Sequence, residues 1–561
     1  MNTIYQKFKL SAKNNSAKAA LYWKSDHFWH HIHYKELLPL VDNLAEGLLH
    51  NNVKHGDRIC ILSENRPEWL ISDLAINKIG AVSVPIHTTS NEPLIEYIIN
   101  DSGSGFLFVS KDIYNKFSVL LNTLIESKSD FKVIIYDNFK NQKVKSALNK
   151  KIIFYKDLIK NNLYHTVEVE NELASIIYTS GTTGEPKGVM LSNENFIANI
   201  DSVYKVFDIR SVDKFLSILP LSHVLERTLG SYIAICAGAS IAYSEGIRKF
   251  SKNLVDIKPT IMIGVPRIFE KTKDKIFAGI KSKNFLIQKL FFVSLKKDDG
   301  SLLKKIADKL IYNKIRHIFG GHLRFAVSGG AAIHERILRF YNNVGIRIVE
   351  GYGLTETSPI IACNTVEERI IGSVGKPLPD VEVKISYEKE ILTKSRSVMM
   401  GYWGKPEMTA EVVDEDGWFK TGDLGFIGHN DVLTIIGRKK DLIVTTNGKN
   451  IYPEKIENVI NLSSYIAQTL VVGHKKNNLA ALIVPEWEAI KSAFGESVDV
   501  RQLIVKELEK YNYQLLEFEK IENFEILEKP FSIEENELTP TLKIRRHYIE
   551  NKYKNKIDKL F

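Results

Sequence analysis

The chain lacks the features that mark several large classes of protein. It has only three cysteines in 561 residues, Cys60, Cys236 and Cys363, and they lie far apart. This number and spacing argue against a disulfide framework or a cysteine-rich metal site, and they suit a reducing compartment such as the cytoplasm. No apolar run reaches about 18 residues, so we expect no membrane-spanning helix. The N-terminal stretch carries lysines but no apolar core, so we do not expect a signal peptide.

The positive charge of the chain is confined to one region. The formal net charge is +9, and residues 271–319 alone contain thirteen Lys or Arg and four Asp, an excess of nine. There is no nucleic-acid-binding module with aromatics set in a basic face, so we do not expect nucleic acid as a partner. Within 271–319, Leu, Ile and Phe alternate with Lys at roughly helical spacing. Two interpretations remain open: a solvated surface helix, or a basic amphipathic face that lies on the inner, anionic surface of a membrane.

Strand and helix patterns alternate from the N-terminus onward. The length predicts two or three domains, and the composition, 44% hydrophobic and 25% charged, is that of a globular protein. Short apolar runs end in small, polar or Gly-rich turns, which predicts a mostly parallel α/β sheet with helices on both faces. The runs that show this most clearly are DRICILS, AVSVPI, FLFVS, SIIYTS, FLSILP, TIMIGVP, RFAVSGG and RIVEGYG. Ligands of such sheets gather at the C-terminal ends of the strands.

The pattern changes at about residue 372. Short β-runs with turns between them predict a small barrel or meander over 372–437. Beyond Arg438, helical and strand patterns alternate again in a lysine-rich segment. We therefore place a domain boundary near Arg438, with a large N-terminal domain at 1–437 and a small α+β C-terminal domain at 438–561.

Residues 178–192, YTSGTTGEPKGVMLS, form a loop rich in glycine and hydroxyls. It is not a Walker A loop, because the glycine spacing differs and Gly188 stands where a magnesium-binding hydroxyl is needed. The flanking runs predict strand, loop, strand. Backbone N–H groups and hydroxyls in such a loop suit an anion, while a flexible hairpin loop without a ligand remains the alternative.

Together with five further motifs, this loop resembles the adenylate-forming superfamily, which includes acyl-CoA synthetases, firefly-type luciferases and peptide-synthetase adenylation domains. The other motifs are LPLSHVLERT, SGGAAI, GYGLTETSP, WFKTGDLG with IIGRKKDLIVTTNGKNIYPEKIE, and LTPTLKIRR. The resemblance covers nearly the whole chain. It implies that a carboxylate attacks the α-phosphate of ATP, that pyrophosphate leaves, and that a thiol, usually that of coenzyme A, captures the acyl-adenylate.

The resemblance also implies roles for individual residues around the phosphates. The loop residues Thr179, Ser180, Gly181, Thr182, Thr183 and Gly184, together with Lys187, would bind the β- and γ-phosphates. Thr355 would bond the α-phosphate, and Glu356 with Thr179 would bind Mg²⁺. A hard cation that keeps few protein oxygens and several phosphate oxygens is what magnesium prefers.

The adenine and ribose have their own set of residues by the same resemblance. Ser328, Gly329, Gly330 and Ala331 would form a flat slot for the base, and Tyr352, within Glu350-Gly351-Tyr352-Gly353, would stack on the ring. Asp423 and Arg438 would bond the ribose hydroxyls, with Ile435 packed beneath. The alternatives are a core aromatic for Tyr352 and, for an Asp423 taken without its motif, a turn cap.

The last group of residues concerns the C-terminal domain. Lys543, in LTPTLKIRR, would bridge the carboxylate and the α-phosphate as they meet. Because this lysine lies outside the large domain, the resemblance implies a mobile C-terminal domain with a hinge at Lys440. Gly448, in TTNGKN, would line the pantetheine tunnel for coenzyme A.

The fuller forms of several motifs look most like the long-chain acyl-CoA synthetase branch, whose substrates are fatty acids. His223 would lie beside the acyl pocket, or else be a half-buried structural histidine. A fatty acyl-AMP ligase or acyl-carrier-protein synthetase, a medium-chain or aryl carboxylate CoA ligase, and a non-catalytic acyl-nucleotide-binding protein are the alternatives. The family's GEI turn reads Lys389-Glu390-Ile391 here, so a turn glycine is missing. We expect a cytoplasmic monomer or homodimer.

Overall fold

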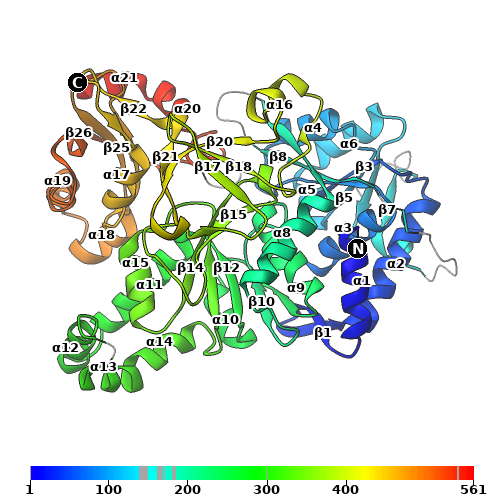
Figure 1. The fold of residues 1–561 in the computed structure, drawn as a ribbon, viewed down its shortest axis with the longest axis horizontal. Helices are drawn as coiled ribbons and strands as arrows, with labels where there is room; N and C mark the ends of the chain where they lie inside the picture. The colour runs from blue at the N-terminus through cyan, green and yellow to red at the C-terminus, as the bar shows by residue number, and fades with distance from the viewer. Residues whose placement is uncertain are drawn as a thin grey trace. The chain divides into compact units, whose positions relative to one another are not determined.

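The computed structural model describes residues 2–137, 150–160, 168–169, 171–179, 185–298, 300–539 and 543–561. The chain divides into two compact units. The first contains most of the chain up to Glu382 together with Thr393–Phe419, and the second consists mainly of Val383–Leu392 and Lys420–Phe561. Figure 1 shows the elements of both.

Two large sheets form the first unit. The nine-stranded sheet has the order β16 (Lys376–Pro377), β15 (Ile360–Cys363), β14 (Ile348–Gly353), β13 (Phe325–Ser328), β12 (Ile261–Gly264), β10 (Lys214–Ser217), β11 (Ser240–Tyr243), β1 (Ala19–Ser25) and β2 (Phe28–His33). The eight-stranded sheet has the order β19 (Gly401–Tyr402), β9 (Lys187–Ser192), β8 (Leu173–Thr179), β4 (Val82–Pro85), β3 (Arg58–Leu62), β5 (Phe106–Val109), β6 (Lys132–Ile135) and β7 (Ile152–Phe154). Inner strands of both sheets pair in parallel, and strands near the edges pair antiparallel.

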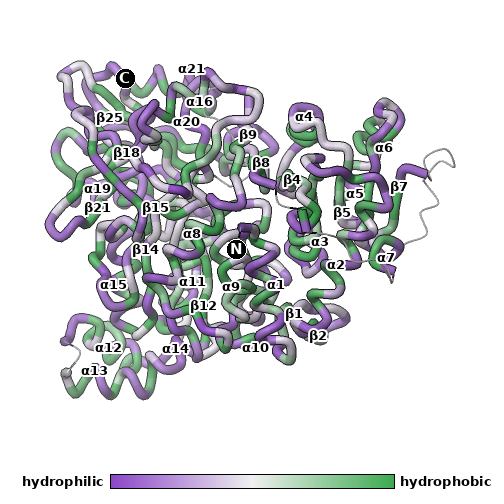
Figure 2. Tube along the Cα trace, turned by 45° about the vertical axis from the view of Figure 1, so that its right-hand side comes forward, coloured by the Kyte–Doolittle hydropathy of each residue, from purple (hydrophilic) through white to green (hydrophobic). Residues whose placement is uncertain are grey.

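The eight-stranded sheet is buried on both faces, as its sequence pattern predicts. The strand β5 is hydrophobic along its length (Figure 2). Phe106 and Phe108 belong to one core, and Leu107 and Val109 belong to the other, because successive side chains of a strand point to opposite faces. Helices therefore cover both sides of this sheet.

Different helices contribute to the two cores on the two faces of that sheet. The shared core contains buried residues of α1 (Ile4–Asn14), α2 (Tyr34–His50), α3 (Pro67–Lys78) and α8 (Asn193–Val206), together with residues from both sheets. The opposite face of the sheet is covered by buried residues of α4 (Glu92–Asp101), α5 (Lys111–Lys116) and α6 (Ser118–Ser127). The remaining helices of the unit are α7 (Tyr155–Leu158), α9 (Ile233–Cys236), α10 (Phe250–Ile257), α11 (Pro266–Lys281), α12 (Phe285–Ser294), α13 (Leu302–Ala307), α14 (Asn313–Ile318), α15 (Glu335–Asn343) and α16 (Pro406–Val412).

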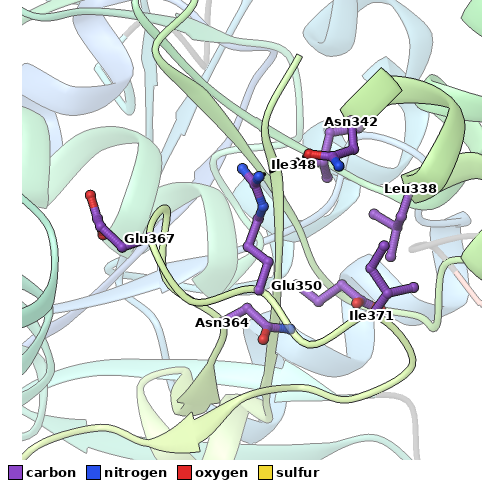
Figure 3. Close-up of a pocket in the computed structure, with 8 residues that line it drawn as sticks. Leu338, Asn342, Ile348, Glu350, Asn364, Glu367 and Ile371 are labelled. Atoms are coloured by element: carbon purple, nitrogen blue, oxygen red, sulfur yellow. Dashed lines mark hydrogen bonds between the residues drawn. The ribbon is translucent and has the colours of Figure 1, made fainter. Parts of the chain in front are cut away.

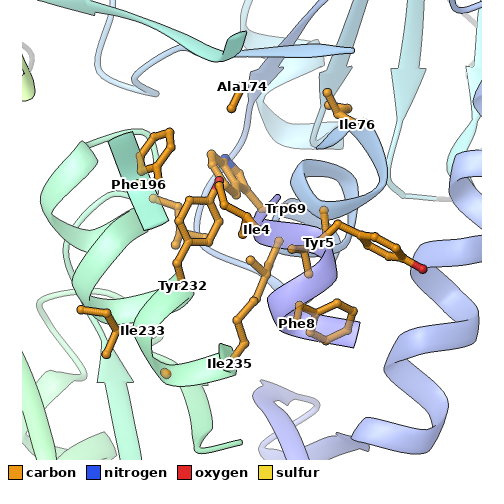
Figure 4. Packing of buried hydrophobic residues seen from close by; sticks show 14 of the residues in the cluster. Ile4, Tyr5, Phe8, Trp69, Ile76, Ala174, Phe196, Tyr232, Ile233 and Ile235 are labelled. Atoms are coloured by element: carbon orange, nitrogen blue, oxygen red, sulfur yellow. The ribbon is translucent and has the colours of Figure 1, made fainter. Parts of the chain in front are cut away.

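The N-terminal helix α1 is part of this shared core. Its residues Ile4, Tyr5 and Phe8 are almost fully buried, and Figure 4 shows them close to Ile235 and Trp69. Thr3 caps the helix by accepting a hydrogen bond from the backbone N–H of Gln6. The sequence analysis did not predict this helix or the hairpin of β1 and β2.

A buried ion pair stands at the centre of the first unit. Asp73 on α3 faces Arg227 on the π-helix η2 (Glu226–Tyr232), and the side chains of both are 1% exposed. Arg227 Nε donates to Asp73 Oδ2 over 2.9 Å, and Nη1 donates to Ser175 Oγ over 2.7 Å. Burial lowers the pKa of Arg227, but the facing Asp73 carboxylate outweighs it and the pKa is raised. The guanidinium therefore stays charged and fully partnered in the core.

The second unit contains a small antiparallel sheet and a terminal α+β part. The four-stranded sheet has the order β17 (Glu382–Ile385), β18 (Glu390–Lys394), β20 (Phe419–Ile427) and β21 (Leu433–Arg438). The terminal part holds a two-stranded sheet of β22 (Ile443–Val444) and β23 (Asn450–Ile451) and a three-stranded sheet of β24 (Ile466–Val472), β25 (Leu479–Pro485) and β26 (Ile521–Ile526). Its helices are α17 (Pro453–Ile460), α18 (Trp487–Phe494), α19 (Val500–Asn512), α20 (Arg546–Lys552) and α21 (Lys554–Ile557).

The predicted fold class is confirmed. The βα-type sheets, the small β subdomain after residue 372 and the α+β C-terminal part are all present. The apolar run SYIAICAGASIAY forms buried helix and strand through the end of η2, α9 and β11. Within the described ranges, no helix has both the length and the apolar composition that crossing a membrane requires.

The buried ion pair supports a stability prediction. We expect Asp73→Ala to lower the free energy of unfolding by about 3–5 kcal/mol, because it leaves the Arg227 charge buried without its carboxylate. Asp208→Ala, which breaks the exposed pair with Arg210, should cost far less, because water screens that pair. Urea unfolding followed by circular dichroism measures both, and equal losses would contradict the role given to Asp73.

Candidate active site

The predicted phosphate loop connects two antiparallel strands. Thr179 ends β8 and is paired with Lys187, the first residue of β9. The prediction of strand, loop, strand is confirmed. Ser180, Gly181, Thr182, Thr183 and Gly184 lie outside the described residues.

A tyrosine that the sequence analysis missed connects Lys187 to Glu356. Tyr402, on β19, pairs with Val189 of β9. Its hydroxyl donates to Glu356 Oε1 over 3.1 Å, and Lys187 Nζ lies 4.9 Å from the centre of its ring. Burial, with the Glu356 charge and hydrogen bond, raises the pKa of Tyr402, so the hydroxyl stays a donor. Three residues distant in sequence therefore bring a cation and a carboxylate to the base of the loop.

The GYGLTE motif leaves the end of a central strand. Glu350, Gly351, Tyr352 and Gly353 lie in β14, and Thr355 and Glu356 begin the short 3₁₀-helix η4 (Thr355–Thr357). A Cβ at Gly353 would lie 1.7 Å from the backbone oxygen of Pro359, so only glycine fits there. The chain folds back tightly at this point. The backbone N–H of Met399 donates to the backbone oxygen of Glu356 over 2.8 Å.

The neighbouring strand β13 carries the SGGA segment. Ser328 ends the strand and lies opposite both Gly264 and Glu350, so the segment emerges beside GYGLTE. Ser328 is buried, and its hydroxyl has no hydrogen-bond partner among the described residues. Gly330 has φ +81°, and a Cβ there would meet only Val265 at 3.8 Å. Ala331 is exposed.

Glu350 borders a cavity of about 120 Å³ between β14, α15 and the segment after β15. Arg369 and Asn342 also border it, and Arg369 Nη2 donates to Asn342 Oδ1 over 2.9 Å. Figure 3 shows Glu350 close to Ile371, with Glu367 pointing away from it. Burial, with a smaller contribution from Glu335, raises the pKa of Glu350 to about 8. The carboxyl is therefore mostly protonated at neutral pH.

His223 follows β10 in a turn that is fixed from both sheets. The Asn65 side chain, beyond β3, donates to Ser217 Oγ and accepts from the backbone N–H of Leu221. The His223 ring lies 6.3 Å from the ring of His87, which follows β4. Burial lowers the pKa of His87 to about 4, and its Nδ1 lies 2.7 Å from Ser222 Oγ. A neutral imidazole thus neighbours His223, and the sequence analysis did not identify it.

The second unit holds a separate group of predicted residues. Asp423 on β20 pairs with Arg438 on β21, and Arg438 Nε lies 3.2 Å from Asp423 Oδ1. Asp423 is buried, Arg438 is half-buried, and Ile435 lies half-buried on β21 opposite Gly425. The carboxylate is therefore held at a fixed position beside a guanidinium.

The missing turn glycine has a structural consequence. Lys389 takes φ +66°, a left-handed conformation that costs a side-chain-bearing residue about 1 kcal/mol. The next residue, Glu390, accepts from the backbone N–H of Gly422 and lies 3.0 Å from Lys439 Nζ. The turn thus keeps the backbone that glycine favours, and Glu390 ties it to the GRKK segment.

Three predicted residues lie on the terminal part of the second unit. Lys440 is exposed in the 3₁₀-helix Lys439–Asp441, and Gly448 is exposed in the turn between β22 and β23 with φ +71°. The backbone N–H of Lys543 donates to Thr539 Oγ1 over 3.0 Å, and the backbone N–H of Thr539 donates to the Lys543 oxygen over 2.8 Å. These two hydrogen bonds fix the backbone of Lys543, an exposed residue, to that of Thr539.

The structure therefore gathers the predicted residues in two groups. Thr179, Lys187 and Glu356 form one with SGGA and GYG on the first unit, and Asp423 with Arg438 forms the other on the second. Of the two residues that were not predicted, Tyr402 forms part of the short strand β19, and His87 follows the short strand β4. Their signals were the GYW run at 401–403 and the HTT run that follows AVSVPI, at the C-terminal end of a strand.

Two family models match the sequence of this chain. Residues 8–403 match the AMP-binding enzymes, and residues 440–561 match the AMP-binding enzyme C-terminal domain. The chain belongs to the AMP-binding enzyme family. This AMP-binding enzyme is 33% identical to the long-chain-fatty-acid–CoA ligase FadD15 of Mycobacterium bovis, over 96% of this chain and 93% of that protein. It is 30% identical to the long-chain-fatty-acid–CoA ligase 5 of Rattus norvegicus, over 100% and 88% of the two chains.

Solved structures support the fold. The adenylation domain of a carboxylate reductase from Mycobacterium chelonae matches with a TM-score of 0.83 at 21% identity, over 100% of this AMP-binding enzyme and 91% of that chain. An anthranilate CoA ligase solved with anthranoyl-AMP matches with a TM-score of 0.77 at 18% identity, over 99% and 98%. At these identities the likeness concerns the fold.

The buried Glu350 carboxyl of the AMP-binding enzyme makes its stability depend on pH. In the folded protein the pKa of Glu350 is about 8, above the ordinary 4.5. The contribution of this carboxyl to the free energy of unfolding is therefore complete below pH 4.5 and is lost as the pH rises through 8. We expect Glu350→Gln to leave stability near pH 5 almost unchanged and to raise it at pH 9, relative to the unaltered protein, by on the order of 3 kcal/mol.

Thermal unfolding across this pH range checks the prediction. Glu335→Gln, at an exposed position on α15, is the control and should shift the pH profile far less. A parallel pH profile for Glu350→Gln and the unaltered protein would refute the assigned pKa.

Proposed function

We propose that the protein is an AMP-forming ligase that activates a long-chain fatty acid with ATP and transfers the acyl group from acyl-AMP to coenzyme A. The main support for this proposal is the match, over nearly the whole chain, to relatives named long-chain-fatty-acid–CoA ligases in bacteria and animals. The contacts around Lys187, Tyr402 and Glu356 support it, because they supply what the reaction needs at the phosphates.

The physical difficulty of the first step is the approach of two anions. At about 4 Å two unit charges repel by roughly 4 kcal/mol at an effective dielectric near 20. Lys187, together with the loop from Thr179 to Gly184, binds the β- and γ-phosphates and lowers this repulsion. Thr355 donates to the α-phosphate, where negative charge develops.

The donor set fits magnesium. Glu356 is fixed by one hydrogen bond to Oε1 from Tyr402, and Thr179 adds a hydroxyl at the strand end. No group of three or more His, Cys, Asp or Glu that suits a metal occurs in the described part of the chain, and a magnesium ion held mainly by phosphate oxygens needs none. When bound through Glu356 and Thr179, Mg²⁺ supplies positive charge that polarises the phosphates.

Glycine-rich backbone and fixed polar side chains bind the nucleoside part of ATP. Ser328, Gly329, Gly330 and Ala331 line the adenine, and the unpartnered Ser328 hydroxyl is a ready hydrogen-bonding group. Tyr352, with Glu350, Gly351 and Gly353, forms the opposite wall of the slot. Asp423 and Arg438 bond the ribose hydroxyls above Ile435.

Lys543 acts at the moment of attack. Its ammonium bridges the carboxylate of the acid and the α-phosphate, and the bonds with Thr539 hold its backbone for this purpose. The domain from residue 438 closes for adenylation and reopens about Lys440, after which the turn at Gly448 lines the path of coenzyme A. His223 lies beside the acyl pocket.

The alternative acceptor is a carrier protein, as in a fatty acyl-AMP ligase. That branch has an insertion near the domain junction, whereas here only the short elements from Lys439 to Ile451 separate Arg438 from α17. A medium-chain or aryl acid is the alternative substrate. The enzyme acts in the cytoplasm, as monomer or homodimer.

The reaction is tested by pyrophosphate release. With Mg²⁺ and ATP, we expect the protein to release pyrophosphate at least about tenfold faster with long-chain fatty acids than with short-chain or aryl acids. Coenzyme A should raise the turnover and yield acyl-CoA, which mass spectrometry detects. Release of pyrophosphate without acyl-CoA would favour the carrier-protein acceptor, and no release with any acid would refute the proposal.

The role of Lys543 is tested by separating the half-reactions. We expect Lys543→Ala to slow acyl-adenylate formation by at least about 100-fold, because charge stabilisation at the α-phosphate is lost. Conversion of supplied acyl-adenylate to acyl-CoA should change less than about threefold. Lys554→Ala, at an exposed lysine of α21, is the matched control. Equal loss of both half-reactions would contradict a role confined to adenylation.

A further inference from the structure

The helices α12 and α13 expose an unusual concentration of apolar side chains. Of the 29 exposed large hydrophobic residues in the described part of the chain, eight fall between residues 285 and 310. They are Phe285, Leu286, Phe292, Val293, Leu302, Leu303, Ile306 and Leu310. The two helices lie side by side, and hydrophobic and hydrophilic residues alternate along them (Figures 1 and 2). Such a patch on a folded protein marks an interaction surface.

The exposed residues of α12 form one stripe. Phe285 and Leu286 are 72% and 74% exposed, and Phe292 with Val293 follows two turns later on the same face. Lys289 lies between these pairs, and its Nζ is 6.0 Å from the centre of the Phe285 ring. Lys296 continues the stripe. The stripe is therefore apolar, with two exposed lysines seven residues apart, about two helical turns.

The helix α13 and its continuation repeat this arrangement. Leu302 is 74% exposed, and Leu303, Ile306 and Leu310 follow at spacings of three and four residues. Lys305 and Lys309 are exposed beside them. Both helices thus present exposed apolar side chains with exposed lysines beside them.

The other faces of the two helices hold them to the unit. Phe291 of α12 contacts Phe277 of α11, with ring centres 5.5 Å apart, and Phe277 contacts Phe340 of α15 at 5.2 Å. Ser294 Oγ and the Tyr312 hydroxyl are hydrogen-bonded over 2.7 Å, which ties α12 to the segment after α13. The most exposed stripe residues, Phe285, Leu286 and Leu302, therefore lie away from this packing face, whereas Phe292, 37% exposed, also contacts Phe277 at 6.0 Å.

We propose that α12 and α13 dock the protein on an anionic lipid surface, with the apolar stripes inserted at the level of the headgroups and the lysines paired with lipid phosphates. The charge decides between occupants. A second copy of this face would bring like charges together, whereas an anionic bilayer complements both the lysines and the apolar side chains. This docking stands independently of the proposed function, and it would place an enzyme for fatty acids where such acids partition.

The test is flotation of the full-length protein with phosphatidylcholine vesicles, with and without phosphatidylglycerol. We expect binding to the anionic vesicles at least about tenfold above binding to the neutral ones, and a marked decrease at high salt. The triple variant Phe285→Ser, Leu286→Ser, Leu302→Ser should lose at least about tenfold in binding to anionic vesicles. The triple variant Lys289→Glu, Lys296→Glu, Lys305→Glu should lose the preference for phosphatidylglycerol.

Matched controls stand elsewhere on the same unit. Phe28→Ser, Val119→Ser, Val212→Ser replaces three side chains of equal exposure, and Lys13→Glu, Lys54→Glu, Lys116→Glu makes the same change of charge. Both should bind anionic vesicles like the unaltered protein. If a control loses as much binding as its matched variant, or if the stripe variants bind normally, the proposal is overturned.

Two further measurements separate the other outcomes. Sedimentation velocity without lipid detects self-association, and dimers that the Phe285, Leu286 and Leu302 variant abolishes would show that a second copy covers the stripes. Acyl-CoA formation from detergent-dispersed fatty acid should be unchanged in the stripe variants. Loss of vesicle binding with this activity intact supports docking, whereas absence of the activity in the unaltered protein would concern the proposed function alone.

Discussion

The buried contact between Asp73 and Arg227 holds together the parts on which the first unit depends. Arg227 also donates to Ser175, which lies on β8 four residues before Thr179. Its backbone N–H donates to the His223 oxygen. Arg227 therefore connects the strand that leads into the phosphate loop, through its guanidinium, with the turn that carries His223, through its backbone. Since the aromatic rings of Trp69, Phe196 and Tyr232 surround it within 5.4–5.6 Å, no water competes for its hydrogen bonds.

The sequence predicted what local patterns determine. Parallel strands buried on both faces read as short apolar runs, and strands such as β5 were predictable for that reason. The order of β8, loop and β9 followed from β-formers on both sides of YTSGTTGEPKG. The same logic placed the SGGA and GYGLTE segments at strand ends. That the two strands are neighbours came from the structure.

What the sequence did not reveal depends on contacts between distant segments. The short strand of Tyr402 exists because it pairs with Val189, more than 200 residues away, and two residues give no periodicity to read. His87 lies beside His223 only because two sheets meet there. The helix α1 has a weak apolar pattern, and its place is set by partners such as Asn193 and Asn77, which accept from its backbone N–H groups. The roles of Lys543 and Glu356 rest on family resemblance, because no propensity distinguishes them from other lysines and glutamates.

The two glycines of the candidate nucleotide site differ in why they are glycine. At Gly353 the Pro359 oxygen occupies the space of any side chain, so a saturation mutagenesis experiment would score every replacement as damaging whether or not a ligand binds. At Gly330 the surroundings are open and only the backbone angle restricts the choice. Intolerance at Gly353 therefore reports on the architecture of the turn. The graded tolerance of Asn, Asp and bulkier residues at Gly330 reports on how closely a bound molecule approaches.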